Sequence, residues 1–138
     1  MELEDPLTGR AMERLTDLAL RMRLPHRSER FLDDRSSGLY MVGETAGELH
    51  AYEYNLKRER LTQVTEGSGL LSDSVTLDGR GRSLFYLQGD RLLADGKTLQ
   101  EVETGWQPTG SLTVSVDGAV VAWIEMREGD EREDPAEQ

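Results

Sequence analysis

The chain has 138 residues, which suits a single folded domain, and 36% of them are hydrophobic. Its formal net charge of −11 argues against nucleic acid as a general partner, and the lack of cysteine excludes disulfides and sulfur-rich zinc sites. No stretch approaches the roughly 18 apolar residues that span a bilayer, and the N-terminus MELEDPLTGR lacks the apolar run of a signal peptide. We therefore expect a soluble, cytoplasmic protein with no membrane partner.

The four letters ERLT occur at 13–16 and again at 59–62, which suggests an internal repeat. Three short apolar runs support it: GLYMVGE at 38–44, SLFYLQG at 83–89 and VVAWIEM at 120–126. Each run follows a polar turn, DDRSSG, LDGRGR or SVDG. Runs of this length, rich in β-branched and aromatic residues, predict strands that are buried on both faces.

Further strands are expected between the apolar runs. SDSVTLDG at 72–79 and SLTVSVDG at 111–118 would lead into the second and third runs, and ELHAYEYNL at 48–56 would follow the first. RLTQVTEG and LQEVETG would end their units as outer strands, and so would both ERLT copies. The segment DLALRMRLP at 17–25 fits either a strand or a short helix before Pro25.

Four short antiparallel strands repeating at 35 to 46 residues predict an all-β fold made of β-propeller blades, with a β-sandwich as the alternative. We expect about three blades in residues 1–126, two of them whole. Since propellers close with about four to eight blades, this ring is incomplete. Either the chain is part of a longer protein or copies associate as a homo-oligomer. Residues 127–138, REGDEREDPAEQ, should form an acidic disordered tail.

The order of these segments resembles that of the oligogalacturonate lyases, a family with a seven-bladed propeller related to TolB. Four segments carry the resemblance: Asp5-Pro6-Leu7-Thr8-Gly9 followed by Arg14-Leu15-Thr16, His26-Arg27, Val64-Thr65-Glu66-Gly67-Ser68-Gly69, and the stretch from Trp106 to Ile124-Glu125-Met126. Together they span residues 5–126, which correspond to the N-terminal blades of a family member. The family's aromatic run after histidine-arginine is shortened here to SERF.

The resemblance implies β-elimination on galacturonide oligomers with a bound manganese ion. In the family, the histidine and glutamine ligands of that metal lie in later blades, so none is carried over to this chain. The resemblance does place His26 and Arg27 as substrate contacts. Arg21 and Arg23 join them, because the segment LRMRLPHRSER at 20–30 is basic and a guanidinium can clamp a carboxylate with two hydrogen bonds.

For other polar and aromatic residues, a structural role competes with a functional one. His50 is expected to be structural, since the chain holds two histidines and no cysteine and cannot complete a histidine-rich metal site. Asp73, Asp78, Asp117 and Glu125 could form acid–base pairs, although Asp-Gly is also ordinary hairpin chemistry. Trp106 and Trp123 could stack on a sugar, but Trp123 lies in an apolar run and is expected in the core.

Two functions follow from this reading. The first is an oligogalacturonate lyase-like propeller that lacks a complete catalytic site and serves as a scaffold or binds an anionic oligosaccharide. The second is a TolB-like propeller module for protein–protein interaction.

Overall fold

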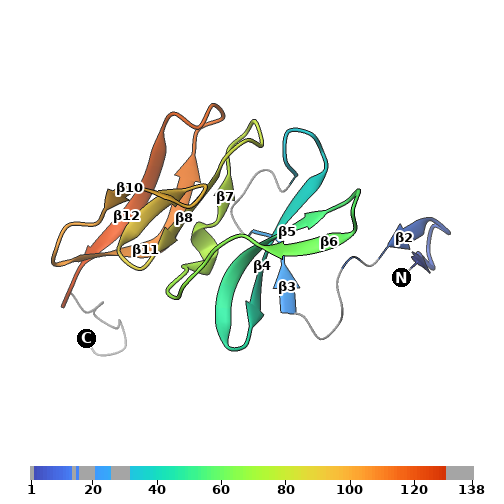
Figure 1. Cartoon of the computed structure of the whole chain (residues 1–138), viewed down its shortest axis with the longest axis horizontal. Coiled ribbons are helices and arrows are strands. Elements are labelled where there is room, and N and C mark those ends of the chain that lie inside the picture. Colours follow the sequence, from blue (N-terminus) through green and yellow to red (C-terminus); the bar gives the residue numbers. More distant parts are fainter. Residues whose placement is uncertain (1, 14, 16–20, 26–31, 130–138) are drawn as a thin grey trace.

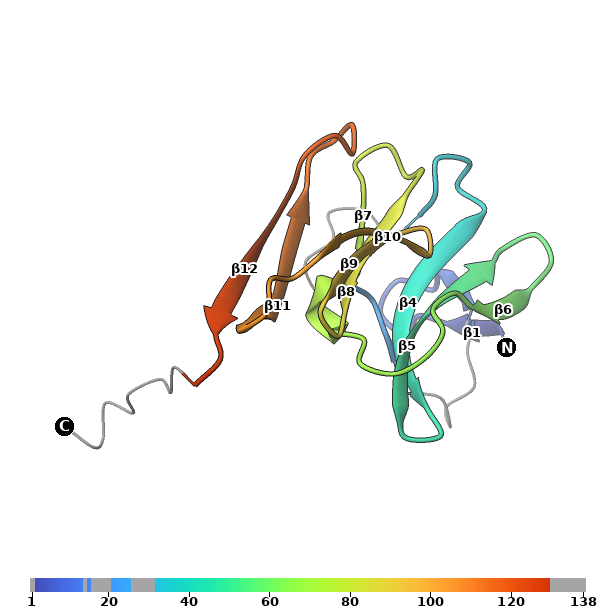
Figure 2. The same ribbon diagram turned by 60° about the vertical axis from the view of Figure 1, so that its left-hand side comes forward.

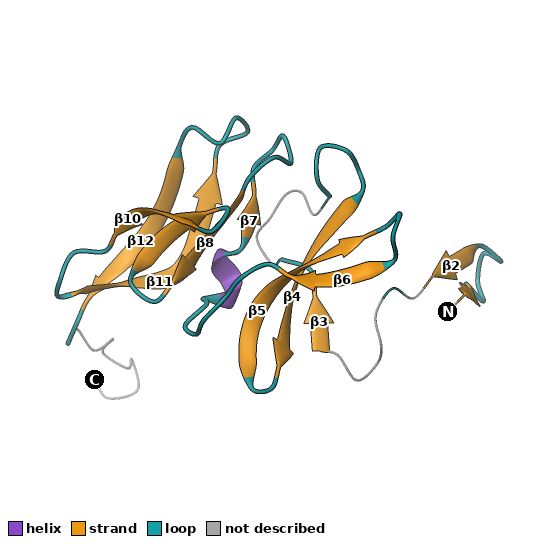
Figure 3. Ribbon diagram, viewed as in Figure 1, coloured by secondary structure: helices purple, strands orange, loops and turns teal. Residues whose placement is uncertain are grey.

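The computed structural model describes residues 2–13, 15, 21–25 and 32–129, and within them the chain is built almost entirely of antiparallel strands (Figures 1 and 3). A hairpin of β1 (Glu2–Glu4) and β2 (Ala11–Glu13) comes first. The first four-stranded sheet contains β3 (Arg21–Arg23), β4 (Gly38–Thr45), β5 (Glu48–Asn55) and β6 (Arg60–Gln63). The second contains β7 (Thr76–Leu77), β8 (Leu84–Gln88), β9 (Arg91–Ala94) and β10 (Lys97–Glu101), preceded by the short 3-10 helix η1 (Ser72–Ser74). Strands β11 (Trp106–Val114) and β12 (Val121–Arg127) form a final hairpin.

Each four-stranded sheet is a meander in which consecutive strands are neighbours, so the predicted antiparallel four-stranded blades are confirmed. In the segment DLALRMRLP, residues 21–23 form a strand and not a helix, while 17–20 lie outside the described residues. Most of the predicted acidic tail, 130–138, also lies outside them, and residue 127 ends β12. No helix in the described part of the chain is long and apolar enough to cross a membrane.

Three equivalent turns define the repeat. In each, a backbone N–H donates to a carbonyl five positions on, joining Asp33 to Gly38 at 2.9 Å, Asp78 to Ser83 at 3.1 Å and Ser115 to Val120 at 2.8 Å. The fourth residue of each turn has a positive φ, 52° at Ser36 and 72° at both Gly81 and Gly118. The predicted alignment of the three apolar runs is therefore confirmed, because the runs begin at the residues that accept these hydrogen bonds.

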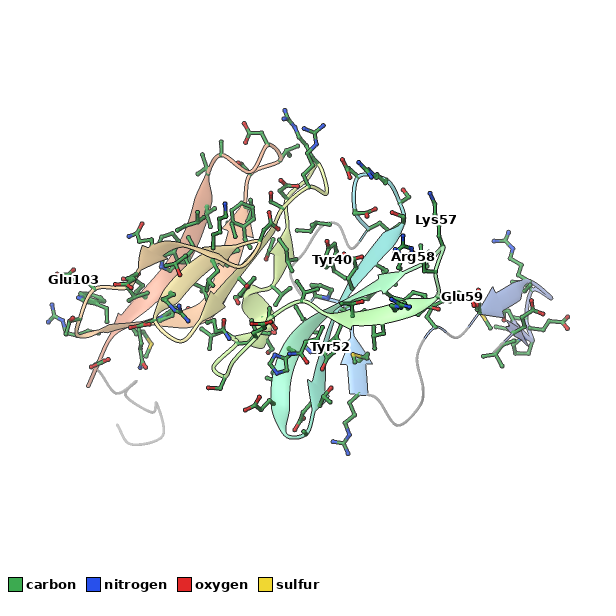
Figure 4. The ribbon with its side chains drawn as sticks, in the orientation of Figure 1. Tyr40, Tyr52, Lys57, Arg58, Glu59 and Glu103 are labelled. Carbon is green, nitrogen blue, oxygen red and sulfur yellow. The ribbon has the colours of Figure 1, made fainter. Side chains whose placement is uncertain are left out.

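The two ERLT copies do not occupy equivalent positions, contrary to our expectation. Asp5 pairs with Arg10 across the β1–β2 turn, as Asn55 pairs with Arg60 across the β5–β6 turn. Both turns begin with a side-chain oxygen that accepts a backbone N–H two residues on, at 3.0 Å in each case. Arg10 therefore corresponds to Arg60. Glu13 ends β2, whereas Glu59 lies in a turn with a φ of 51° (Figure 4).

The leading segment SDSVTLDG is also not the continuous strand that we expected. Residues 72–74 turn into η1, and the strand proper is limited to Thr76–Leu77. The Ser74 hydroxyl explains the interruption, because it accepts the Leu87 N–H at 2.8 Å and donates to the Leu71 carbonyl at 2.6 Å. The Ser74 side chain thus accepts the hydrogen bond from the Leu87 N–H of β8, which a backbone carbonyl of a neighbouring strand would otherwise accept.

The core lies between successive sheets. One cluster joins the first and second sheets and includes Val42, Ala51, Leu70, Val75, Leu77, Leu84, Tyr86 and Leu93. The other joins the second sheet to the β11–β12 hairpin and includes Phe85, Leu87, Leu92 and Leu112. Alternate residues of β8 enter different clusters, so the prediction of a strand buried on both faces is confirmed for the second run.

For the third run that prediction is wrong. Val121 and Trp123 of β12 pack against the second cluster, but Val120 is 65% exposed and Ile124 is 62% exposed. A strand is buried on both faces only where a sheet lies on each side. In the described residues, β12 has the second sheet on one side alone.

Candidate functional site

The predicted basic contacts begin at β3. Arg21 and Arg23 stand two residues apart on this strand, so their side chains project from the same face, and both residues are exposed. Arg21 lies opposite Glu44 of β4 and Arg23 lies opposite Val42. The structure therefore brings two guanidinium groups together on one exposed surface.

Arg23 also makes an ion pair across two sheets. Its Nη2 lies 3.2 Å from Oδ1 of Asp73 in η1, and the two side chains are 44% and 52% exposed. An exposed pair of this kind contributes only about 0 to 1 kcal/mol. From the sequence, Asp73 is expected only as a possible member of an acid–base pair. Aligning the leading segments of neighbouring blades side by side would have placed it near Arg23.

All three leading segments leave their partner strand within one residue of the same place. Before the break, the partners are Arg23 and Val42 in the first unit, Leu70 and Gln88 in the second, and Pro108 and Glu125 in the third. After the break, pairing resumes at Leu32 with Leu39, Thr76 with Phe85, and Leu112 with Trp123. The intervening residues are 24–31, 71–75 and 109–111, and we call these three segments the insert row.

The second and third segments of the insert row are neighbours in space. β11 contacts η1, and a Cβ built on Gly110 would lie 3.9 Å from the Leu71 side chain. The Arg23 ion pair with Asp73 links the first unit to the second. His26 and Arg27 fall in the first insert, and both lie outside the described residues.

His50 is buried between polar partners. Its Nδ1 lies 3.2 Å from the Thr65 hydroxyl and its Nε2 lies 3.4 Å from a carboxylate oxygen of Glu48. The Thr65 oxygen also accepts the Ala51 N–H at 3.0 Å. This arrangement ties β5 to the segment after β6, as expected of a structural histidine.

The described residues do not fit a manganese site. Among residues 2–13, 15, 21–25 and 32–129, no three or more histidine, aspartate or glutamate side chains cluster so as to hold a metal ion. His50 is the one histidine in that set, and both of its ring nitrogens are engaged. We therefore derive no metal-assisted step for this part of the chain.

The Asp-Gly motifs serve the turns. Asp78 accepts the Arg82 N–H at 2.9 Å, and Asp117 accepts the Ala119 N–H at 3.1 Å. The Ser115 hydroxyl and the Ala119 N–H lower the pKa of Asp117, because both hydrogen bonds favour its ionised form. The hairpin reading of these two carboxylates is thus confirmed.

The two tryptophans lie on the β11–β12 hairpin. Trp123 is half-buried against the second cluster, and its indole N–H donates to Glu125 at 2.7 Å. The Arg127 guanidinium lies over the Trp106 ring, 5.3 Å from its centroid. Trp123 therefore packs on the core, and it also lines an open hollow together with Leu112 and Ile124.

Comparison with known proteins supports the fold. No protein-family model matches the sequence, and no curated protein does. Among solved structures, an oligogalacturonate lyase from Vibrio parahaemolyticus matches with a TM-score of 0.81 and 19% identity. An oligogalacturonate lyase in complex with manganese matches with a TM-score of 0.81 and 23% identity. Both matches cover 96% of this chain.

The chain spans 37% of the length of each of these two lyases. The match confirms the predicted fold class, antiparallel blades of the β-propeller type, and the structural resemblance to oligogalacturonate lyases. At identities this low, the two matches show only that this chain shares the fold.

Proposed function

We propose that this chain binds short anionic uronide oligosaccharides on β3 and the adjoining insert row, and acts as a lyase-like propeller scaffold without a complete catalytic site. The observation that carries the proposal is the pair of exposed guanidinium groups, Arg21 and Arg23, on one face of the leading strand. They occur in a chain whose fold matches two oligogalacturonate lyases. His26 and Arg27 belong to the proposed site through the family resemblance, and a cytoplasmic location is part of the same proposal.

The chemistry of a uronide suits these groups. Each sugar unit carries a carboxylate, which a guanidinium binds with two parallel charge-assisted hydrogen bonds. Elimination beside that carboxylate would further require a base for the adjacent proton and a cation to neutralise the developing charge. The described residues offer the guanidinium clamp, and the absence of turnover is part of the proposal that an activity assay tests.

The ion pair between Arg23 and Asp73 makes the proposal sharper. A ligand carboxylate would have to displace Asp73 from the Arg23 guanidinium, so the pair competes with binding. Replacing Asp73 by asparagine removes the competing charge and leaves the size of the side chain unchanged. We expect Asp73→Asn to bind oligogalacturonate roughly 2- to 5-fold more tightly, in proportion to the small value of an exposed ion pair.

Calorimetric titration of the purified chain with a galacturonate oligomer tests the proposal. Arg21→Ala and Arg23→Ala should each weaken binding by roughly 3- to 10-fold, as expected for loss of a charge-assisted contact. Arg60→Ala is the matched control, because Arg60 is an exposed arginine on β6, away from the insert row. Binding should also fall as salt rises. Equal losses in all three variants would contradict a specific site.

Turnover is tested separately. The chain is incubated with the oligomer and manganese, and the ultraviolet absorbance of an unsaturated product is followed. We expect none. Steady product formation that His26→Ala abolishes would instead place a lyase site within this chain.

The alternative is a propeller module for protein–protein interaction, and the exposed apolar side chains Val120 and Ile124 favour it. The titration separates the two functions. An interaction module would bind no galacturonate oligomer, and its Arg21→Ala variant would behave like the unmodified chain.

A further inference from the structure

The two hairpins at the ends of the described chain are complementary halves of one blade. The turn of β11–β12 matches the turn before β4, so β11 and β12 correspond to β3 and β4. The turn of β1–β2 matches the turn between β5 and β6, so β1 and β2 correspond to β5 and β6. The first hairpin thus supplies the two strands that would follow β12 in a whole blade.

We propose that β12 of one copy pairs with β1 of a second copy to complete a shared four-stranded blade. The register follows from the first whole blade, where Gly38 pairs with Asn55 and Tyr40 pairs with Glu53. Val120 corresponds to Gly38 and Asp5 corresponds to Asn55. Carried over to the shared blade, this register places Ala122 of β12 opposite Leu3 of the second copy.

The exposed apolar side chains agree with this register. Val120, Ala122 and Ile124 alternate along β12 and therefore share a face. Leu3 pairs with Met12 inside the first hairpin, so these two residues also share a face. All of these residues are exposed, Leu3 by 42%, Met12 by 45%, Val120 by 65% and Ile124 by 62%. Pairing Ala122 with Leu3 joins them into one apolar stripe across three strands.

The backbone favours the same contact. In the described sheets, β11 is the one neighbour of β12, so the other edge of β12 presents a row of backbone donors and acceptors. An exposed strand edge of this kind is a template for pairing with another chain. Strand β1 has a matching edge, because its neighbour in the described sheets is β2.

The partner strand at the edge of β12 comes from a second copy, because the two hairpins of one copy lie far apart. They stand at opposite ends of the molecule, with both four-stranded sheets between them (Figures 1 and 2). Two copies that exchange hairpins would combine their whole blades with two shared ones. The resulting ring of six lies within the range of about four to eight blades at which propellers close. The two shared blades are identical by two-fold symmetry, so the assembly ends at two copies.

Light scattering on the purified chain is the first test, and it should give a mass twice the 15.5 kDa of one copy. Ile124→Lys should weaken dimerisation roughly 10-fold or more, because it puts a charge where the apolar stripe is buried. The matched control is Leu99→Lys, since Leu99 is a similarly exposed leucine on β10 and lies outside the stripe. A monomer at all concentrations would overturn the proposal. So would a mass that keeps rising, or equal effects of the two variants.

Disulfide trapping tests the register. The chain contains no cysteine, so an engineered pair reports a single contact. Leu3→Cys combined with Ala122→Cys should give a covalent dimer on mild oxidation, because directly opposed residues fall within the roughly 4.4 to 6.8 Å between Cα atoms that a disulfide requires. Leu3→Cys with Val121→Cys is the control, since Val121 faces the opposite side of the sheet. Equal yields from the two pairs would overturn the register.

Discussion

One position in the repeat has different surroundings in different blades. Val42, Leu87 and Ile124 are equivalent when counted from the three turns, and each is an aliphatic residue in an inner strand. Val42 and Leu87 are fully buried, whereas Ile124 is 62% exposed. The local sequence makes the same strand in each case, but burial depends on the sheet that lies against it. Ile124 is therefore the position from which a missing neighbour can be recognised.

Truncating the side chain at this position should lower the free energy of unfolding by different amounts in different blades. Leu87→Ala is expected to lower the free energy of unfolding by about 2 to 5 kcal/mol, because it leaves a cavity between two sheets. Ile124→Ala should change it by about 0.5 kcal/mol or less, the usual range for an exposed site. Urea unfolding of dilute protein, below the concentration at which copies associate, measures both values. A large loss for Ile124→Ala in the monomer would mean that the chain itself covers this face of β12.

The turns offer a second comparison among equivalent positions. Ser36, Gly81 and Gly118 all adopt a positive φ, which costs a residue with a Cβ about 1 to 2 kcal/mol. Gly81→Ala should therefore destabilise the chain by about 1 kcal/mol or more, while Ser36→Gly should be neutral or stabilising. Thermal unfolding of the two variants under identical conditions measures the difference. Shifts in the same direction would show that the three turns are not interchangeable.

Features set by local chemistry could be predicted from the sequence. The polar turn followed by an apolar run identifies the repeat, because in each turn an aspartate carboxylate accepts a backbone N–H within a few residues. The ERLT repeat misled us, because its letters recur out of register with those turns. Identical letters indicate a structural period only when they lie at the same distance from the same turn.

Features set by stacking between blades could not be predicted. The Arg23 contact with Asp73 joins residues of different sheets, and the exposure of Ile124 depends on a neighbour that the local sequence does not specify. The break in the second leading strand depends on one serine hydroxyl that bonds β8. Half of the proposed site, Arg21 and Arg23, was identified from charge clustering alone. His26 and Arg27 remain predictions.

The smallest expected effect concerns the acidic residues after β12. Deleting 130–138 should change the free energy of unfolding by less than about 0.5 kcal/mol, because this segment is almost entirely polar and charged and has little apolar surface to bury. The deletion keeps Arg127, whose guanidinium lies over Trp106. Urea unfolding of the shortened chain, beside a variant that also carries Arg127→Ala, separates the tail from that contact. A loss above about 1 kcal/mol for the deletion alone would show that the tail stabilises the fold, either over the exposed face of β12 or on the basic segment at 20–30. The exposure of Ile124 would then need to be measured again in the presence of the tail.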